Sequence, residues 1–301
     1  MPASLNDKIV IAISSRALFD LDDSNTVFEE KGLEEYIKYQ IDHENEILKK
    51  GVAFSLIKKL LDIRYPHNDA GIFEVILVSR NDANTGLRVF NAIEHYGLDI
   101  TRAAFTGGNS PYNYLKSFNS SLFLSAKNED VRLALENGYA AATILKGSDF
   151  NEEDSGCLRI AFDGDAVIFS DESEAVYKSS GIEAFKKNES DNSETPLNPG
   201  PFKPFLESLS KIQSAFRGVP EKPIRTALVT ARNAPAHKRA IKTLRYWGVN
   251  VDESFFLGGL DKAPILERFR PHIFFDDQMA YCDPASKIVP TGHVPSGIAN
   301  S

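Results

Sequence analysis

The stretch Leu158-Arg-Ile-Ala-Phe-Asp-Gly-Asp-Ala-Val-Ile-Phe169 decides how this chain is expected to fold. Its first five residues, Leu158 to Phe162, form a short apolar run that predicts a buried β-strand. Asp163 and Asp165 follow the strand at once, with only Gly164 between them. The sequence therefore places two carboxylates directly at the end of a buried strand.

Three more short apolar runs follow and alternate with helical patterns. They are Ile224 to Val229, Ser254 to Leu257 and His272 to Phe275. A helical stripe before the second of these ends at Gly248, the position where a C′ glycine is expected. Strands that alternate with amphipathic helices predict an α/β fold with a parallel sheet. Ligands of such sheets bind beyond the carboxyl ends of the strands.

The chain also repeats itself, because residues 77–126 match residues 228–277 at a fixed offset of 151 without a gap. Three glycines and three phenylalanines are among the identical pairs. Upstream, residues 8–15 resemble residues 158–165, and Gly51 resembles Gly200. We therefore expect two related α/β halves, at residues 1–150 and 157–301.

A long insert, residues 170–222, follows the first strand of the second half. We expect it to form a helical cap over that half. Its polar, Pro/Gly-rich portion at 186–201 is predicted to break two helical segments. This portion is typical either of a surface loop or of a mobile lid, and the sequence leaves both interpretations open.

Composition limits the class of protein. The 301 residues are 42% hydrophobic and 25% charged, which is typical of an ordinary globular protein. A formal net charge of −8 gives no global attraction to nucleic acid or anionic lipid. The apolar run at 9–14 is too short for a signal or membrane segment, so we expect a cytoplasmic protein that binds neither nucleic acid nor membrane. Cys157 and Cys282 are predicted to be reduced thiols.

The strand ends of the second half gather residues that suit phosphate chemistry. The set is Asp163, Gly164, Asp165, Thr230, Arg232, Lys262, Asp276 and Asp277. Carboxylates that lie together repel one another unless a hard cation neutralises them, and Mg²⁺ is the natural choice. Lysine and threonine beside such a cation suit a phosphate group. One carboxylate can then attack phosphorus while another protonates the leaving oxygen.

The first half lacks these acids. At the same offset Lys262 corresponds to Pro111, Asp276 to Ser125 and Asp277 to Ala126. Near Asp163 and Asp165 the first half has Ile13 and Ser15. The scaffold is thus expected to be duplicated and the chemistry confined to the second half.

Three long motifs carry a family resemblance. They are Ala161-Phe-Asp-Gly-Asp-Ala-Val-Ile-Phe-Ser-Asp-Glu-Ser-Glu174, Leu228-Val-Thr-Ala-Arg232 and Arg270-Pro-His-Ile-Phe-Phe-Asp-Asp-Gln-Met279. They resemble the haloacid dehalogenase superfamily and, more narrowly, the cytosolic 5′-nucleotidase type I family. Further likeness at 11–20, 78–81 and 105–111 extends the resemblance over nearly the whole chain. It implies a Rossmann-like parallel sheet with a helical cap.

The resemblance also implies an activity, the Mg²⁺-dependent hydrolysis of nucleoside 5′-monophosphates such as AMP or IMP through an aspartyl phosphate. By this likeness Asp163 is the nucleophile and a metal ligand, and Asp165 is the general acid and then base, with its backbone carbonyl on the metal. Thr230 and Lys262, with the loop at Gly164, hold the phosphoryl group. Asp276 and Asp277 complete the metal site, and the resemblance does not say which of them touches the metal directly.

Several other features of the sequence allow more than one interpretation. Arg80, Asn81 and Arg232 are candidate substrate-binding residues, although a surface arginine or a salt bridge explains them as well. The acids of Phe19-Asp-Leu-Asp-Asp23 lie beyond the expected end of a strand and are interpreted as loop acids. A phosphatase for sugar phosphates and an inactive nucleotide-binding regulator remain competing hypotheses. The sequence is compatible with a homo-oligomer and does not give base preference or allosteric control.

Overall fold

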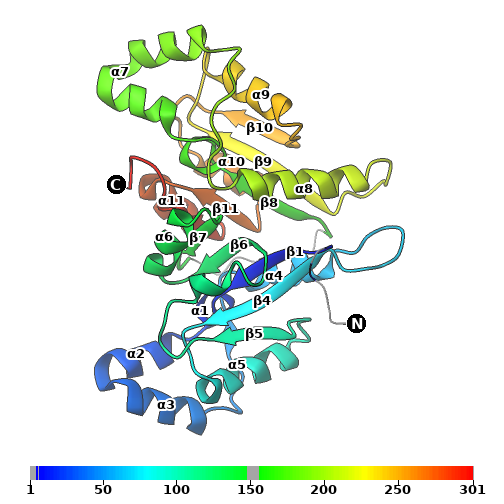
Figure 1. Cartoon of the computed structure of the whole chain (residues 1–301), viewed down its shortest axis with the longest axis vertical. Helices are drawn as coiled ribbons and strands as arrows, with labels where there is room; N and C mark the ends of the chain where they lie inside the picture. The colour runs from blue at the N-terminus through cyan, green and yellow to red at the C-terminus, as the bar shows by residue number, and fades with distance from the viewer. Residues whose placement is uncertain (1–4, 6, 148–155, 301) are drawn as a thin grey trace. The chain divides into compact units, whose positions relative to one another are not determined.

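The structure is a computed structural model that describes residues 5, 7–147 and 156–300, and Figure 1 shows its course. The chain forms two compact units, Met1–Leu133 and Ala134–Ser301. Each has its own α/β layers, as the sequence predicted. Among the described residues no helix is both long and apolar enough to cross a membrane.

The first unit is built on a parallel sheet. Its strands lie in the order β6-β1-β4-β5. Their bounds are Ile9–Ile13 for β1, Phe73–Ser79 for β4, Arg102–Phe105 for β5 and Ser120–Ser125 for β6. The helices are α1 (Ser15–Leu18), α2 (Asp22–Lys31), α3 (Leu33–Asp42), α4 (Phe54–Asp62) and α5 (Ala83–His95), and α6 (Asn128–Glu136) crosses the division. A separate short pair joins β2 (Phe19–Asp20) to β3 (Lys49–Lys50).

The second unit repeats this plan and extends it. The order is β10-β9-β8-β11-β12-β7, with only β7 antiparallel to its neighbour. The strands are β7 (Ala141–Ile144), β8 (Leu158–Phe162), β9 (Ile224–Thr230), β10 (Glu253–Phe256), β11 (Ile273–Asp276) and β12 (Thr291–His293). The helices are α7 (Glu172–Asp191), α8 (Lys203–Ala215), α9 (His237–Tyr246), α10 (Ala263–Phe269) and α11 (Met279–Ser286).

The two units share one strand order, since β5-β4-β1-β6 corresponds to β10-β9-β8-β11. Equivalent glycines also adopt the same left-handed backbone, with φ of 62° at Gly97 and 67° at Gly248. Even the helices beyond the first strand agree. Gly32 (φ 83°) separates α2 from α3, and Gly181 (φ 77°) kinks α7. These features agree with the predicted duplication.

The division of the compact units does not coincide with that of the duplication. β7 pairs with β12, so residues 134–147 pack with the second unit. The sequence repeat predicts halves at 1–150 and 157–301. The compact units instead follow the packing of the chain, which divides it after Leu133.

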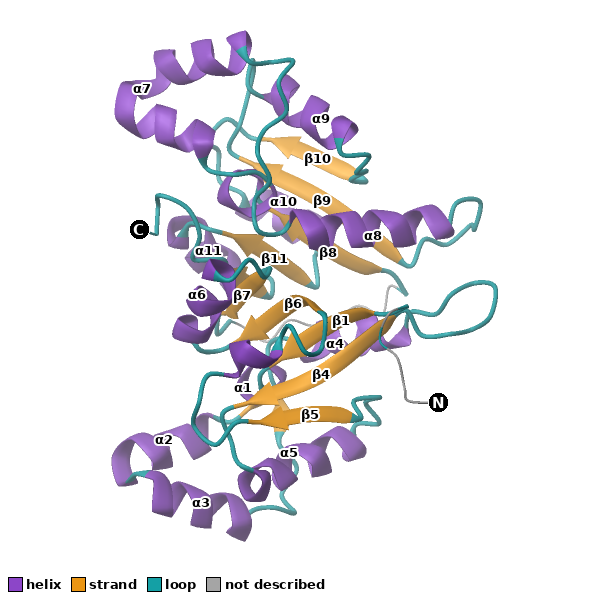
Figure 2. Ribbon diagram, in the orientation of Figure 1, coloured by secondary structure: helices purple, strands orange, loops and turns teal. Residues whose placement is uncertain are grey.

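Two apolar layers enclose the sheet of the second unit. On one face Leu266 and Phe269 of α10 and Ala285 of α11 pack against Ala161 and Phe274. On the other, Phe205 of α8 lies 6.4 Å from Phe162 between ring centroids. Thus α8 is a sheet-covering helix, and only α7 of the 170–222 insert projects from the layers (Figure 2). Figure 2 also shows β9, β10 and β11 of this unit pointing toward the end where α7 lies, which places α7 beside the carboxyl ends of these strands.

Candidate active site

Three carboxylates meet at the ends of β8 and β11. Asp163 directly follows β8, Asp276 ends β11 and Asp277 comes next. The two strands are parallel neighbours with Phe275 opposite Phe162, so their carboxyl ends lie together. One oxygen from each carboxylate lies within 4.8 Å of the others, and all three residues are buried.

Lys262 links two of these acids. Its Nζ donates to Asp163 Oδ1 at 2.5 Å and to Asp276 Oδ2 at 2.6 Å, and its side chain is only 2% exposed. Burial by itself lowers the pKa of Lys262, but Asp163 and Asp276 outweigh this effect and raise it above the usual value. The ammonium therefore stays charged and neutralises part of the cluster.

One ammonium does not balance the cluster. Burial, together with Asp276 and Asp165 and against the pull of Lys262, raises the pKa of Asp163 to about 7. Burial and the charges of Asp163 and Asp276 raise the pKa of Asp277 to about 9. Both carboxylate oxygens of Asp277 are buried without a hydrogen-bond partner among the described residues. Such a group is costly unless a cation or a proton compensates it, so the donor set fits a hard divalent cation.

The neighbouring strand end brings a hydroxyl and a tight turn. Thr230 ends β9, and its Oγ1 accepts from Arg232 N at 3.2 Å. A Cβ at Gly164 would lie 3.0 Å from this Oγ1, so the turn after Asp163 has little room for a side chain. Ala166 in the same turn is left-handed at φ 58°, a strained conformation of the kind that clusters at functional sites.

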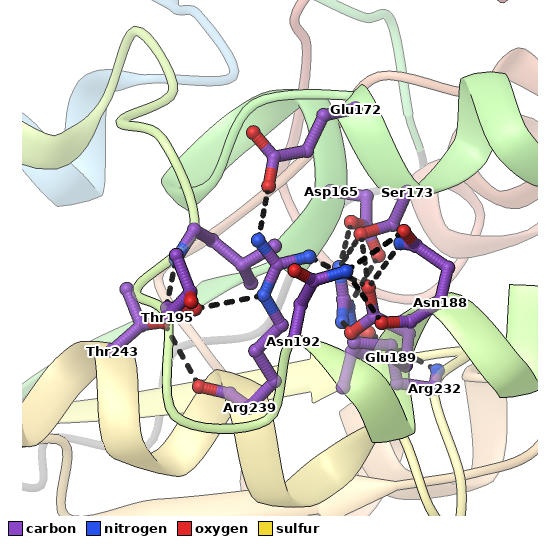
Figure 3. A network of polar contacts seen from close by, with 12 residues as sticks. Asp165, Glu172, Ser173, Asn188, Glu189, Asn192, Thr195, Arg232, Arg239 and Thr243 are labelled. Atoms are coloured by element: carbon purple, nitrogen blue, oxygen red, sulfur yellow. Dashed lines mark hydrogen bonds and ion pairs between the residues drawn. The ribbon is translucent and has the colours of Figure 1, made fainter.

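Arg232 holds the second acid of the motif. Its Nε donates to Asp165 Oδ2 at 2.8 Å and its Nη2 to Asp165 Oδ1 at 2.6 Å, a bidentate pair (Figure 3). Arg232 also contacts Glu189 at 2.5 Å and donates to Ser173 at 2.9 Å. Burial lowers the pKa of this guanidinium, but Asp165 and Glu189 raise it well above its usual value. The arginine is thus a permanent cation that fixes the position of Asp165.

The same network ties α7 to the sheet. Glu189, with no exposed surface, also accepts from Arg239 at 2.9 Å, and Arg239 reaches Glu172 at 2.7 Å (Figure 3). The predicted break between two helical segments lies between Asp191 and Lys203, so α7 runs on into the polar stretch at 186–201 before it ends. These buried ion pairs require a helical turn around Glu189, and tertiary contacts therefore override the polar local composition.

A cavity of about 330 Å³ opens beside the acids. Asp163, Asp165 and Thr230 line one side. Tyr177, Ile182 and Phe185 of α7 line it as well, with the two rings 6.3 Å apart between centroids. Carboxylates thus share one pocket with an aromatic wall.

Most of the predicted site residues come together here. Asp163, Gly164, Asp165, Thr230, Arg232, Lys262, Asp276 and Asp277 all belong to the second unit and surround this region. Arg80 and Asn81 belong to the first unit and line a different cavity there. Arg80 is held by Asp130, with its Nε donating at 3.0 Å. Asp20, of the second acidic motif, is exposed on the two-residue strand β2 and not on a loop, and it lies outside both cavities.

Comparisons with known proteins identify the family of the chain. The sequence model described as 5′-nucleotidase matches residues 1–301. The chain belongs to the 5′-nucleotidase family. It is 42% identical over 297 residues to cytosolic 5′-nucleotidase 1B from Homo sapiens.

The similarity to the human protein covers unequal shares of the two chains. It includes 95% of this chain and 48% of the human protein, so the chain spans about half the length of the curated relative that it matches. No solved structure matches the chain significantly.

The structure of this 5′-nucleotidase family member adds residues that the sequence did not single out. Glu174 lines the cavity, and its charge contributes to the raised pKa of Asp277. Glu189 lies in the stretch interpreted as a loop or lid, so no local signal marked it as a partner of two arginines. The pairing of the two halves also needs a correction of one residue. β1 ends at Ile13 and β8 at Phe162, so Ser14 corresponds to Asp163, and Arg16 rather than Ser15 to Asp165.

Replacing Asp277 by asparagine tests the electrostatic account. A carboxyl whose pKa is raised on folding stabilises the native state at low pH, and this contribution is lost as pH rises from the unfolded value, about 4, through the folded value. The metal-free wild type should therefore lose stability from pH 5 to pH 9. Over this range the unfolding free energy of Asp277→Asn should fall by at least about 2 kcal/mol less than that of the wild type, as measured by denaturant titration in EDTA.

Asp283, exposed on α11, supplies the matched control. Asp283→Asn should follow the wild type at both pH values. Parallel pH dependence of the wild type and Asp277→Asn would contradict the account.

Proposed function

We propose that this chain hydrolyses nucleoside 5′-monophosphates to nucleoside and phosphate. The observation that carries the proposal is the buried cluster of Asp163, Asp276 and Asp277, bridged by Lys262, at the edge of an aromatic-walled cavity. Membership of the 5′-nucleotidase family supports it, as does the printed name of the human relative. That name also supports a cytoplasmic location.

Mg²⁺ is the cation that we propose for the cluster. Asp163, Asp277 and Asp276 would hold it together with the backbone carbonyl of Asp165. The unpartnered carboxylate oxygens of Asp277 favour a direct contact from that residue. When bound, the cation offsets the negative charge of the carboxylates and of the phosphate, so that nucleophile and substrate can approach.

Four side chains of the chain carry out the steps of the reaction. The carboxylate of Asp163 attacks phosphorus, the bond from phosphorus to the ribose 5′ oxygen breaks, and Asp165 donates its proton to that oxygen. Lys262 and Thr230 contact the phosphoryl oxygens during the transfer. Asp165, now ionised, takes a proton from water, and the water attacks phosphorus to release phosphate and free Asp163.

The aromatic side of the cavity favours a nucleoside over a bare sugar. Tyr177 and Phe185 present flat apolar surface, which suits a heterocyclic base better than a sugar ring rich in hydroxyls. Both rings come from α7, and the network around Glu189 fixes this helix to the sheet.

A substrate panel tests the choice of substrate. Nucleoside 5′-monophosphates should exceed sugar phosphates in kcat/KM, and phosphate release should need Mg²⁺. A sugar phosphate that surpasses every nucleotide would favour the alternative phosphatase. No phosphate release from any member of the panel, with or without Mg²⁺, would favour the inactive regulator.

Asp163→Asn tests the nucleophile. An amide cannot form the phosphoryl ester, so turnover of AMP should fall at least about a thousandfold. Asp20→Asn is the control, because Asp20 is exposed in the first unit and its side chain only caps a turn to Asp22 N. Substantial turnover by Asp163→Asn would overturn the assignment, provided that Asp20→Asn behaves as the wild type.

Arg232→Lys tests whether Arg232 positions Asp165. Lysine cannot reproduce the bidentate contact, so kcat for AMP should fall about 10- to 100-fold with little change in KM. An aryl phosphate with a good leaving group needs less help from an acid in the first step. The fall in kcat of Arg232→Lys should therefore be smaller with this substrate than with AMP. Arg239→Lys, which contacts Glu189 but not Asp165, is the matched control. Equal losses on both substrates, or in both variants, would contradict a positioning role.

A further inference from the structure

A cavity of the first unit lies at the carboxyl edge of its sheet, the edge at which the acids of the second unit lie in theirs. It measures about 560 Å³, against about 330 Å³ beside Asp163. Ser14, Ser79 and Ser125, which follow or end β1, β4 and β6, line it. These are the strands that correspond to β8, β9 and β11, so the cavity occupies the position of the active site on the duplicated scaffold.

The residues at this position lack the carboxylates of the second unit. Ser14 replaces Asp163, Ser125 replaces Asp276 and Ala126 replaces Asp277. Arg16 stands in the place of Asp165, so a cation replaces an anion. Without buried carboxylates the site needs no divalent cation to accept a phosphate. It also lacks the carboxylate nucleophile, because Ser14 follows β1 where Asp163 follows β8.

The floor of the cavity offers polar groups. Ser15 Oγ and Ser79 Oγ lie 3.0 Å apart, and Ser14 Oγ accepts from Ala126 N at 3.2 Å. Asn81 Oδ1 accepts from the Tyr36 hydroxyl at 2.8 Å, while its Nδ2 is buried with no partner among the described residues. A donor left in this state beside a cavity indicates a missing acceptor, since buried amides are normally hydrogen-bonded.

Each of the three acids that line the cavity has a hydrogen-bond partner. Asp130 accepts hydrogen bonds from Arg80 and Ser110, and Asp82, the N-cap of α5, accepts one from Thr85 N. Glu29 accepts from Asn25 at 2.6 Å. The remaining cations that line the cavity are Arg16 in α1 and Lys127 after β6. Arg16 Nη2 lies 3.4 Å from Asp22 Oδ1 and Lys127 Nζ lies 3.5 Å from Glu129 Oε2, and all four side chains are partly exposed.

The wall formed by α2 and α3 is aromatic and apolar. Phe28 and Tyr36 pack edge to face with ring centroids 5.8 Å apart, and Leu33 and Ile37 extend the surface. Phe28 is 47% and Leu33 60% exposed, which is unusual for side chains of this size. A flat ring placed against Phe28 would cover this apolar surface.

We propose that the first unit binds a phosphorylated aromatic small molecule of the mononucleotide class without a metal ion and without hydrolysing it. The phosphate lies at the serine-lined floor, near Arg16 and Lys127, and accepts a hydrogen bond from Asn81 Nδ2. The ring lies against Phe28 and Tyr36. This second site is distinct from the catalytic one, and its ligand remains intact.

Calorimetric titration of the full chain in EDTA tests the proposal, with AMP, adenosine and inorganic phosphate as separate probes. AMP should bind saturably and more tightly than either of its parts. Ser14→Asp keeps a side chain that can cap α1 but returns an anion to the floor, so AMP should bind at least about tenfold more weakly. Phe28→Ala should weaken it severalfold.

Two controls locate the ligand. Ile41 is as exposed as Phe28, 47%, on the neighbouring helix but does not line the cavity, so Ile41→Ala should bind as the wild type does. Asp283→Asn, an exposed substitution in the second unit, should also leave metal-free AMP affinity unchanged. No saturable AMP binding in EDTA would overturn the proposal, as would affinity unchanged in both Ser14→Asp and Phe28→Ala. If Ser14→Asp fails to fold by circular dichroism, the comparison of Phe28→Ala with Ile41→Ala decides. Because no turnover is measured, the result is independent of the nucleotidase activity proposed for the second unit.

Discussion

The structure of the second unit depends on carboxylates that are buried together at the ends of β8 and β11. Lys262 neutralises only part of their charge, and the raised pKa values of Asp163 and Asp277 reflect the remainder. A fold that keeps such groups out of water gives up stability unless a ligand compensates them. This uncompensated charge is what suits the site to a cation and a phosphate. Part of the formal charge of −8 of the whole chain is therefore concentrated at this cluster.

The duplicated scaffold separates structure from chemistry. Both units have the same strand order, and a buried Ser–Gln–Arg contact of Ser24, Gln40 and Arg88 corresponds to Ser173, Glu189 and Arg239. The substitution of Gln40 by Glu189 adds the charge that anchors Arg232 and, through it, Asp165. One scaffold thus holds two different sites because a few strand-end residues differ.

Local sequence patterns predicted the parts of the fold that depend on local structure. Strands β8, β9, β10 and β11, the helix that stops before Gly248 and the gathering of acids at strand ends all follow from periodicity and from the geometry of parallel sheets. Strands β7 and β12 of the same unit were not predicted. The end of α7 was not predicted either, because the contacts of Glu189 with Arg232 and Arg239 are distant in sequence. In the first unit, the candidate residues Arg80 and Asn81 do line the cavity. Its serines and Arg16 were missed, since they carry no motif and become visible only when strand ends are compared in space.

Chemical trapping of the phosphoenzyme tests the central claim, that the chemistry takes place at Asp163. Borohydride reduces an aspartyl phosphate to homoserine, which peptide mass spectrometry locates in the sequence. With AMP and Mg²⁺, quenched during the first turnover, homoserine should form at position 163 and should be absent without substrate. Homoserine at another aspartate, or AMP turnover with no homoserine at any position, would contradict the account.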